Sequence, residues 1–139
     1  MLYPLLLSAA LVADSMTVEL SVPEHVRAGV PVPLTLRATN HGPRPAALYL
    51  RGRPVAFDVI VTNARGKVVW RRLRGATISM VLQIRELAPG ESLELADTWN
   101  QRTNAGVPVP PGEYRLTGRL LTDTERPLES PPVRLRITP

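Results

Sequence analysis

Apolar and polar residues alternate along most of the chain after Met16. In the segment Thr17–Val22, valine or leucine occupies every second position, and threonine, glutamate and serine lie between them. A period of two predicts a β-strand with one buried and one exposed face. The same alternation predicts further strands at residues 34–39, 46–50, 57–62, 67–70, 80–85, 92–96, 113–120 and 133–137.

Turn-forming residues separate these segments. Asn40–Pro43, Asn63–Gly66 and Leu87–Gly90 contain the asparagine, glycine and proline residues typical of tight turns. The chain has 15 prolines, which interrupt most windows that could otherwise form a helix. Because a sheet with one apolar face must be covered by another layer, we expect an all-β fold. The prediction is an immunoglobulin-like antiparallel β-sandwich of about eight strands.

The first fifteen residues differ from the rest. Leu2–Ala13 is an apolar run that is shorter than the roughly twenty residues needed to span a bilayer. It has the apolar region and small residues of a signal peptide but no basic residue before Asp14. Residues 1–15 are therefore a packed segment, a signal-like segment, or a stretch upstream of a true start at Met16. Residues 16–139 are predicted to form one domain, and a chain that begins at Met16 is predicted to fold and to be more soluble.

The composition excludes several kinds of site. Cysteine is absent, which excludes disulfides, zinc–thiolate sites and a cysteine nucleophile. The two histidines, His25 and His41, do not have the spacing of metal ligands. The chain also lacks the sequence motifs of serine hydrolases, zinc peptidases, and nucleotide-binding proteins. We therefore expect no enzymatic activity, no catalytic residue, no metal and no cofactor.

The net charge is +5, and sixteen of the seventeen basic residues are arginine. A high positive charge promotes non-specific attraction to polyanions. Single-stranded nucleic-acid binding also needs exposed aromatic side chains, and the chain has only two Trp, three Tyr and one Phe. We therefore expect no nucleic-acid partner. Four arginines lie at outward positions of the last two predicted strands, where they form either one basic face or an ordinary solvated surface: Arg115, Arg119, Arg134 and Arg136.

Individual aromatic and acidic residues allow more specific expectations. Tyr114 follows the turn Pro110–Gly112, the place of a tyrosine corner, in which the hydroxyl group bonds to nearby backbone. Trp70 and Trp99 each end a predicted strand, and each is either core material or an exposed anchor for a partner. Asp97 interrupts an apolar alternation, so it is either turned outward by a bulge or partly buried in a hydrogen bond.

The order of features between Phe57 and Leu121 resembles the BsuPI family of intracellular proteinase inhibitors. The matching stretches are Phe57–Asn63, Gly66–Arg71, Leu87–Ser92, Trp99, Gly106 and Val109–Tyr114. The resemblance implies an immunoglobulin-like fold and inhibition of an intracellular serine protease. The chain departs from the family pattern at Arg72–Ser79, where an aromatic and polar segment is expected. If this loop carries the recognition, the departure implies a different partner.

This resemblance implies a protein-binding domain that acts through a protruding loop on a protein partner, such as a subtilisin-like serine protease. Two loops are long enough, Arg71–Ser79 and Asn100–Pro111. The alternative is a structural or adhesive immunoglobulin-like module without inhibitory activity. We expect a cytoplasmic location, or export if residues 1–13 act as a signal. The candidate partner-binding residues are Arg71, Arg72, Leu73, Arg74, Trp99, Val107 and Val109.

Overall fold

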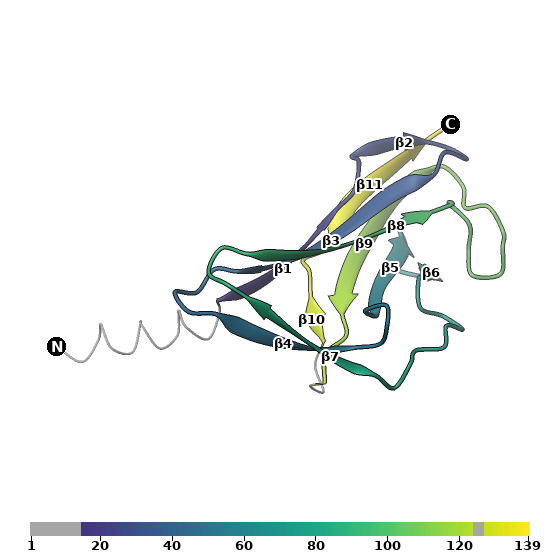
Figure 1. Ribbon diagram of the computed structural model, residues 1–139. Coiled ribbons are helices and arrows are strands. Elements are labelled where there is room, and N and C mark those ends of the chain that lie inside the picture. The colour runs from purple at the N-terminus through teal and green to yellow at the C-terminus, as the bar shows by residue number, and fades with distance from the viewer. Residues whose placement is uncertain (1–14, 124–126) are drawn as a thin grey trace.

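The computed structural model describes residues 15–123 and 127–139, and all regular structure among them is β-strand. Every strand predicted from the alternation is present, with ends shifted by a few residues (Figure 1). The strands are β1 (Met16–Ser21), β2 (His25–Arg27), β3 (Val32–Asn40), β4 (Ala46–Arg51), β5 (Phe57–Asn63), β6 (Val68–Arg71), β7 (Leu82–Leu87), β8 (Ser92–Trp99), β9 (Gly112–Leu120), β10 (Leu128–Glu129) and β11 (Val133–Thr138). Only the very short strands β2 and β10 were not predicted.

The strands form three sheets. One sheet has the order β1-β3-β8, and a larger one has the order β2-β11-β9-β5-β6, with β10 also paired to β9. Strands β4 and β7 form a third, two-stranded sheet. Every pair is antiparallel except the short β2–β11 pair, which is parallel. The prediction of an all-β, immunoglobulin-like antiparallel sandwich is confirmed.

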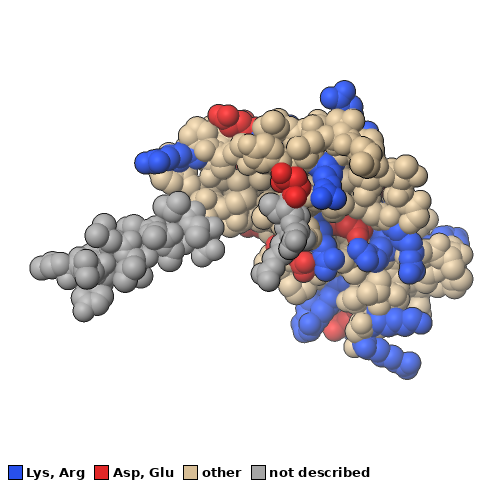
Figure 2. All heavy atoms as spheres, turned by 90° about the horizontal axis from the view of Figure 1, so that it is seen from below, with Lys and Arg blue, Asp and Glu red and all other residues tan. Residues whose placement is uncertain are grey.

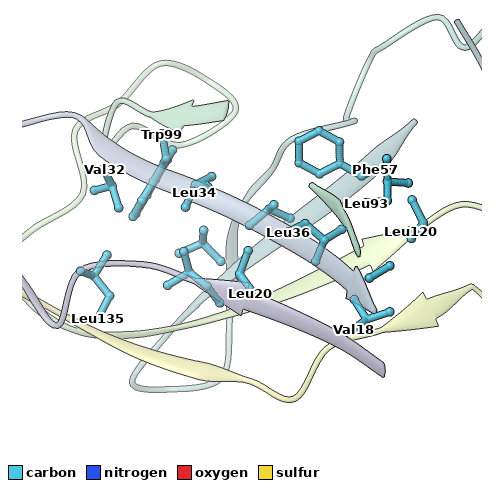
Figure 3. Packing of buried hydrophobic residues seen from close by; sticks show 14 of the residues in the cluster. Val18, Leu20, Val32, Leu34, Leu36, Phe57, Leu93, Trp99, Leu120 and Leu135 are labelled. Carbon is cyan, nitrogen blue, oxygen red and sulfur yellow. The ribbon is translucent and has the colours of Figure 1, made fainter. Parts of the chain in front are cut away.

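The core lies between the first two sheets. Alternate residues of each long strand point into it, such as Leu34 and Leu36 of β3 and Val59 and Val61 of β5, all of which are at most 1% exposed (Figure 3). Gly118 of β9 faces Leu36 of the opposite sheet. A Cβ atom at this position would lie 2.5 Å from Leu36 Cδ1, so any larger residue requires the buried Leu36 side chain to move.

A buried asparagine connects the third sheet to the sandwich. The side-chain amide of Asn40 donates hydrogen bonds to the carbonyl oxygens of Arg44, at 2.8 Å, and Leu87, at 3.0 Å. Its Oδ1 accepts a hydrogen bond from the Gly42 amide at 2.9 Å. Asn40 thereby holds the end of β3 against the start of β4 and the end of β7.

The β4–β7 sheet has one buried and one exposed face. Leu48, Leu50 and Leu87 point inward and belong to the core. The opposite face carries Tyr49 and Ile84, which are directly paired across the two strands and are both exposed. The edge of β4 that does not pair with β7 is hydrogen-bonded to the residues just after β9, for example from Asp123 N to Tyr49 O at 3.1 Å. Within the part of the chain that the structure describes, no strand pairs with the other edge of β7.

The N-terminal expectations concern residues 1–14, which lie outside the described residues, so the three interpretations of this segment stay open. Ser15 contacts the domain, since its carbonyl oxygen accepts a hydrogen bond from the His41 amide at 2.7 Å. None of the described residues belongs to a helix long and apolar enough to cross a membrane.

Candidate functional site

An aromatic cluster supports the segments that follow β6 and β8. Trp99 has no exposed surface, and its ring lies 5.9 Å from that of Trp70, at an interplanar angle of 28°. Tyr114 meets Trp99 edge-on at 6.1 Å. The Tyr114 hydroxyl donates a hydrogen bond to the Pro110 carbonyl, which confirms the predicted tyrosine corner. Trp99 is therefore core material, and Trp70 is half-buried at the margin of the core.

A buried carboxylate fixes the start of the first candidate loop. The Asp58 side chain is only 3% exposed, and its Oδ2 accepts hydrogen bonds from Arg71 Nη2 at 2.6 Å and Nε at 3.1 Å. Its Oδ1 accepts one from the Leu73 amide at 3.0 Å. The two carboxylate oxygens thus hold residues 71–73 against the outer face of β5. Arg71 therefore already has an ion-pair partner within the protein, and Leu73 is half-buried.

Arg72 is also engaged within the molecule. Its guanidinium group lies 3.7 Å from the centre of the Phe57 ring. Arg72 donates hydrogen bonds to the Phe57 carbonyl at 2.7 Å and to Asp97 Oδ2 at 2.6 Å. The register between β3 and β8 is continuous past Asp97, so no bulge turns this residue outward. Asp97 is instead a half-exposed ion-pair partner of Arg72.

The second candidate loop is a compact hairpin that contacts the first. Its turn is closed by a backbone bond from Thr103 N to Val107 O at 2.8 Å. At the tip, the Asn104 side chain forms two hydrogen bonds with the backbone of Arg71: Oδ1 accepts from the amide at 2.8 Å, and Nδ2 donates to the carbonyl at 2.9 Å. These bonds satisfy backbone groups at the edge of β6. The two candidate loops are therefore neighbours.

The seven candidate partner-binding residues divide by burial. Trp99 and Val109 lie in the core, where their side chains have little or no surface to offer to a partner. Arg71 and Arg72 are held by Asp58 and by Phe57 and Asp97 as described, and Leu73 is half-buried. The side chains left free at the surface are those of Arg74 and Val107.

The structure shows an exposed apolar group that the sequence interpretation missed. The chain between β6 and β7 runs along the outside of the molecule (Figure 1). It bends at Met80, whose side chain is fully exposed. Leu82 and Ile84 of β7 are also exposed. We call Met80, Leu82 and Ile84 the apolar strip. The alternation at residues 80–85 predicted a strand with one buried side, but these apolar residues lie on its exposed side.

The four arginines of the last two long strands lie in a mixed environment. Arg115 and Arg134 are paired directly across β9 and β11. Arg119 forms an ion pair with Glu129 at 2.9 Å, and Arg136 is paired with Glu113 across the strands. Figure 2 shows Lys and Arg side chains gathered over one half of the view from below, with acidic side chains among them. Among the described residues, no cluster of histidine and carboxylate side chains could hold a metal ion.

The protein is an immunoglobulin-like β-sandwich in which the two candidate loops contact each other. The sequence profile of the BsuPI family, described as intracellular proteinase inhibitor, matches residues 16–125, and the chain belongs to this family. No significant match is found among curated proteins.

Solved structures resemble this chain at low sequence identity. The sporulation control protein Spo0M from Bacillus subtilis is 12% identical, with a TM-score of 0.51 over 89% of this chain and 49% of that one. A CARDB domain from Pyrococcus furiosus is 16% identical, with a TM-score of 0.45 over 88% of this chain and 87% of that one. At such identities the similarity concerns the fold alone.

Proposed function

We propose that this protein inhibits a serine protease of the cytoplasm by binding it through a protruding loop, and that it is not itself an enzyme. The observation that carries the proposal is its membership of the intracellular proteinase inhibitor family over residues 16–125. The structure adds a fitting surface, since the segment between β6 and β7 is exposed from Arg74 to Leu82.

The physical basis of inhibition is a loop that is ordered before binding. Ordering a loop upon association costs free energy, so a loop that is already fixed binds more tightly. Asp58, Arg72 and Asn104 fix the chain just before the exposed segment. The 100–111 hairpin is the second candidate, with Val107 exposed beside it. On these two loops, the side chains that remain available to contact a partner are those of Arg74 and Val107.

The experiment is an inhibition assay with the full chain at micromolar concentration against a panel of serine proteases that includes an intracellular subtilisin-like enzyme. We expect loss of activity of at least one protease, and loss of the complex when the protease's catalytic serine is first blocked with a bulky covalent reagent. A circular dichroism spectrum shows in parallel that the chain is folded. Folded protein that inhibits no protease of the panel would overturn the proposal and support a structural or adhesive module instead.

A further inference from the structure

We infer that the bend at Met80 inserts into the active-site cleft of the protease, with the Met80 side chain in the primary specificity pocket. The apolar strip and Tyr49 then form the contact surface around it. This inference rests on the proposed function and assigns the site and the pocket chemistry to it. The partner is a serine protease with an apolar primary pocket.

The exposure of Met80 is the first observation. It is the most exposed of the large apolar side chains in the described chain, and it lies at a bend that projects it outward. Leu82 and Ile84 follow at alternate positions, and Tyr49 lies opposite Ile84 on the same face. Exposed apolar groups that are contiguous in this way are typical of protein-interaction sites. A central apolar anchor with a surrounding apolar rim is the usual arrangement of interface hot spots.

The intervening residues hold this segment in place. The turn Arg51–Arg53 is hydrogen-bonded to the segment around Met80. Gly52 N donates to Val81 O at 2.8 Å, and Arg53 N donates to Ser79 Oγ at 3.0 Å. Gln83 Nε2 donates to Gly52 O at 2.6 Å. Positions 79, 81 and 83 are therefore anchored to the domain, while positions 80, 82 and 84 face the solvent.

Gly52 makes this support possible. Its φ angle of +88° is a conformation that residues with a Cβ atom rarely adopt, and an added Cβ would lie 2.9 Å from the Pro54 carbonyl oxygen and 3.3 Å from Ile78 Cγ2. A larger residue at position 52 would therefore disturb the turn that binds this segment.

The backbone of the segment is available to a partner. Within the described residues, the amide and carbonyl groups of Thr77, Ile78 and Met80 form no hydrogen bond with the protein. The outer edge of β7 is also unpaired. Proteins that recognise an extended peptide commonly pair with such free backbone groups and use pockets to recognise the side chains. The groove and pocket of a serine protease provide both, and an apolar pocket accepts an apolar primary side chain.

Charge favours a protease over a second copy of this chain. The acidic Asp123 lines the same cavity as Met80, but four exposed arginines lie on the elements that bind, precede or follow the segment: Arg51, Arg53, Arg74 and Arg85. None of them forms an ion pair within residues 15–123 and 127–139. A symmetric contact between two copies would bring these like charges together, which opposes association. A partner with acidic groups around its apolar pocket is complementary to them.

The test compares variants at Met80 in the full chain. Because the side chain is fully exposed, its replacement leaves the fold intact, which an unchanged melting temperature verifies. Met80→Asp should weaken inhibition of the target protease at least a hundredfold, since a carboxylate is unfavourable in an apolar pocket. Met80→Arg should weaken it similarly and confer inhibition of a trypsin-like enzyme, whose pocket has an acidic base. The matched control is Val30→Asp, an equal charge change at an exposed valine outside both candidate loops, which should leave inhibition unchanged. A further variant, Val107→Asp, tests the second loop.

The outcomes separate this inference from the proposed function. If the wild-type chain inhibits and Met80→Asp inhibits equally well, the inference is wrong and the proposed function stands. Loss of inhibition in Val107→Asp alone would move the site to the second loop and also overturn the inference. If the wild type inhibits no protease, both fail. Sedimentation of the wild type and Met80→Asp tests whether a second copy of this chain covers the apolar strip instead. A wild-type dimer that Met80→Asp dissociates, with inhibition unchanged, would assign the strip to self-association and overturn the inference.

Discussion

At the scale of single residues, two ion pairs order the loop that follows β6. Asp58 is buried and binds both the side chain of Arg71 and the backbone of Leu73. Arg72 bridges Phe57 and Asp97. From the sequence, Arg71 and Arg72 were expected to be available for a partner because they lie at the start of a long loop. Their acidic partners are 13 and 25 positions distant in the chain, respectively, and no local pattern indicates such pairs.

Replacing Asp58 by alanine should lower the free energy of unfolding by about 1–3 kcal/mol, because hydrogen bonds from a guanidinium group and a backbone amide are lost. The control is Asp97→Ala, which removes a half-exposed ion pair and should cost at most about 1 kcal/mol. Urea unfolding monitored by fluorescence measures both values. Equal losses in the two variants would contradict the structural role assigned to Asp58.

The two tryptophans should differ in their contribution to stability. Trp99→Ala should cost about 3–5 kcal/mol, as expected for a large, fully buried side chain. Trp70→Ala should cost clearly less, because Trp70 is half-buried. The double variant should show a coupling of about 0.5–1.5 kcal/mol, since the two rings are stacked. Thermal and urea unfolding of the four proteins give these values, and a Trp70 variant as unstable as the Trp99 variant would contradict the ranking.

Local and distant contacts also differ in how well the sequence predicts them. The hydrogen bond from Tyr114 to Pro110 joins residues four positions apart and follows from the turn between them. The buried side chain of Gln101, in contrast, bonds to the backbone of Arg27 and Val30, more than seventy positions away. Nothing near Gln101 in the sequence indicates these partners, so its role is visible only in the folded structure.

At the scale of elements, a strand is predictable from alternation when it is long enough and one of its faces is buried. The strands β3, β5 and β9 meet both conditions, and their buried apolar positions agree with the prediction, although Asp58 of β5 is buried as well. The strands β2 and β10 have three and two residues and show no period. Strand β7 exposes Leu82 and Ile84 and buries Leu87, because a pattern of hydrophobicity alone does not indicate which face of a strand is covered.

The packing of the two main sheets should be sensitive to Gly118. Gly118→Ala should destabilise the protein by about 1–3 kcal/mol, because the added methyl group would overlap with Leu36, which is itself fully buried. Thr117→Ala, on the neighbouring position that faces the other way, serves as the control and should have a smaller effect. The measurement is the urea midpoint. A stabilised Gly118→Ala variant would show that the sheets have room at this point.

At the scale of the whole molecule, the sequence predicted the layer architecture because every sheet with an apolar face requires a second one. It did not predict how the third sheet attaches, since that depends on the buried Asn40 and on backbone bonds to the end of β9. The location of the protruding surface was predicted in part. The loop after β6 was identified, but its most exposed residue, Met80, was assigned to the next strand.

The stability of the molecule should decrease at alkaline pH. Burial raises the pKa of Tyr114 above its ordinary value of 10.0. The folded state therefore holds this proton more tightly than the unfolded state, and the associated stability is present below about pH 10 and is lost as the pH rises through the raised pKa. Tyr114→Phe should be less stable at neutral pH by about 1 kcal/mol, through loss of the bond to Pro110, yet should decline less above pH 10.

Urea unfolding at several pH values between 7 and 11 checks this dependence. The exposed Tyr49, replaced by phenylalanine, is the control and should leave the alkaline decline of the wild type unchanged. Parallel pH profiles for the wild type and Tyr114→Phe would contradict the contribution of Tyr114.

The stacked pair of Trp70 and Trp99 also provides an intrinsic fluorescence probe of binding. These are the only two tryptophans in the chain, so nearly all of its intrinsic emission originates from one point, immediately before the segment that leads to Met80. The half-buried indole of Trp70 adjoins Arg71, which the Asn104 hairpin contacts. Docking of a partner at this margin would change the emission of the pair, whereas binding elsewhere would leave it unaltered. A titration in which the partner carries no tryptophan therefore requires no attached dye.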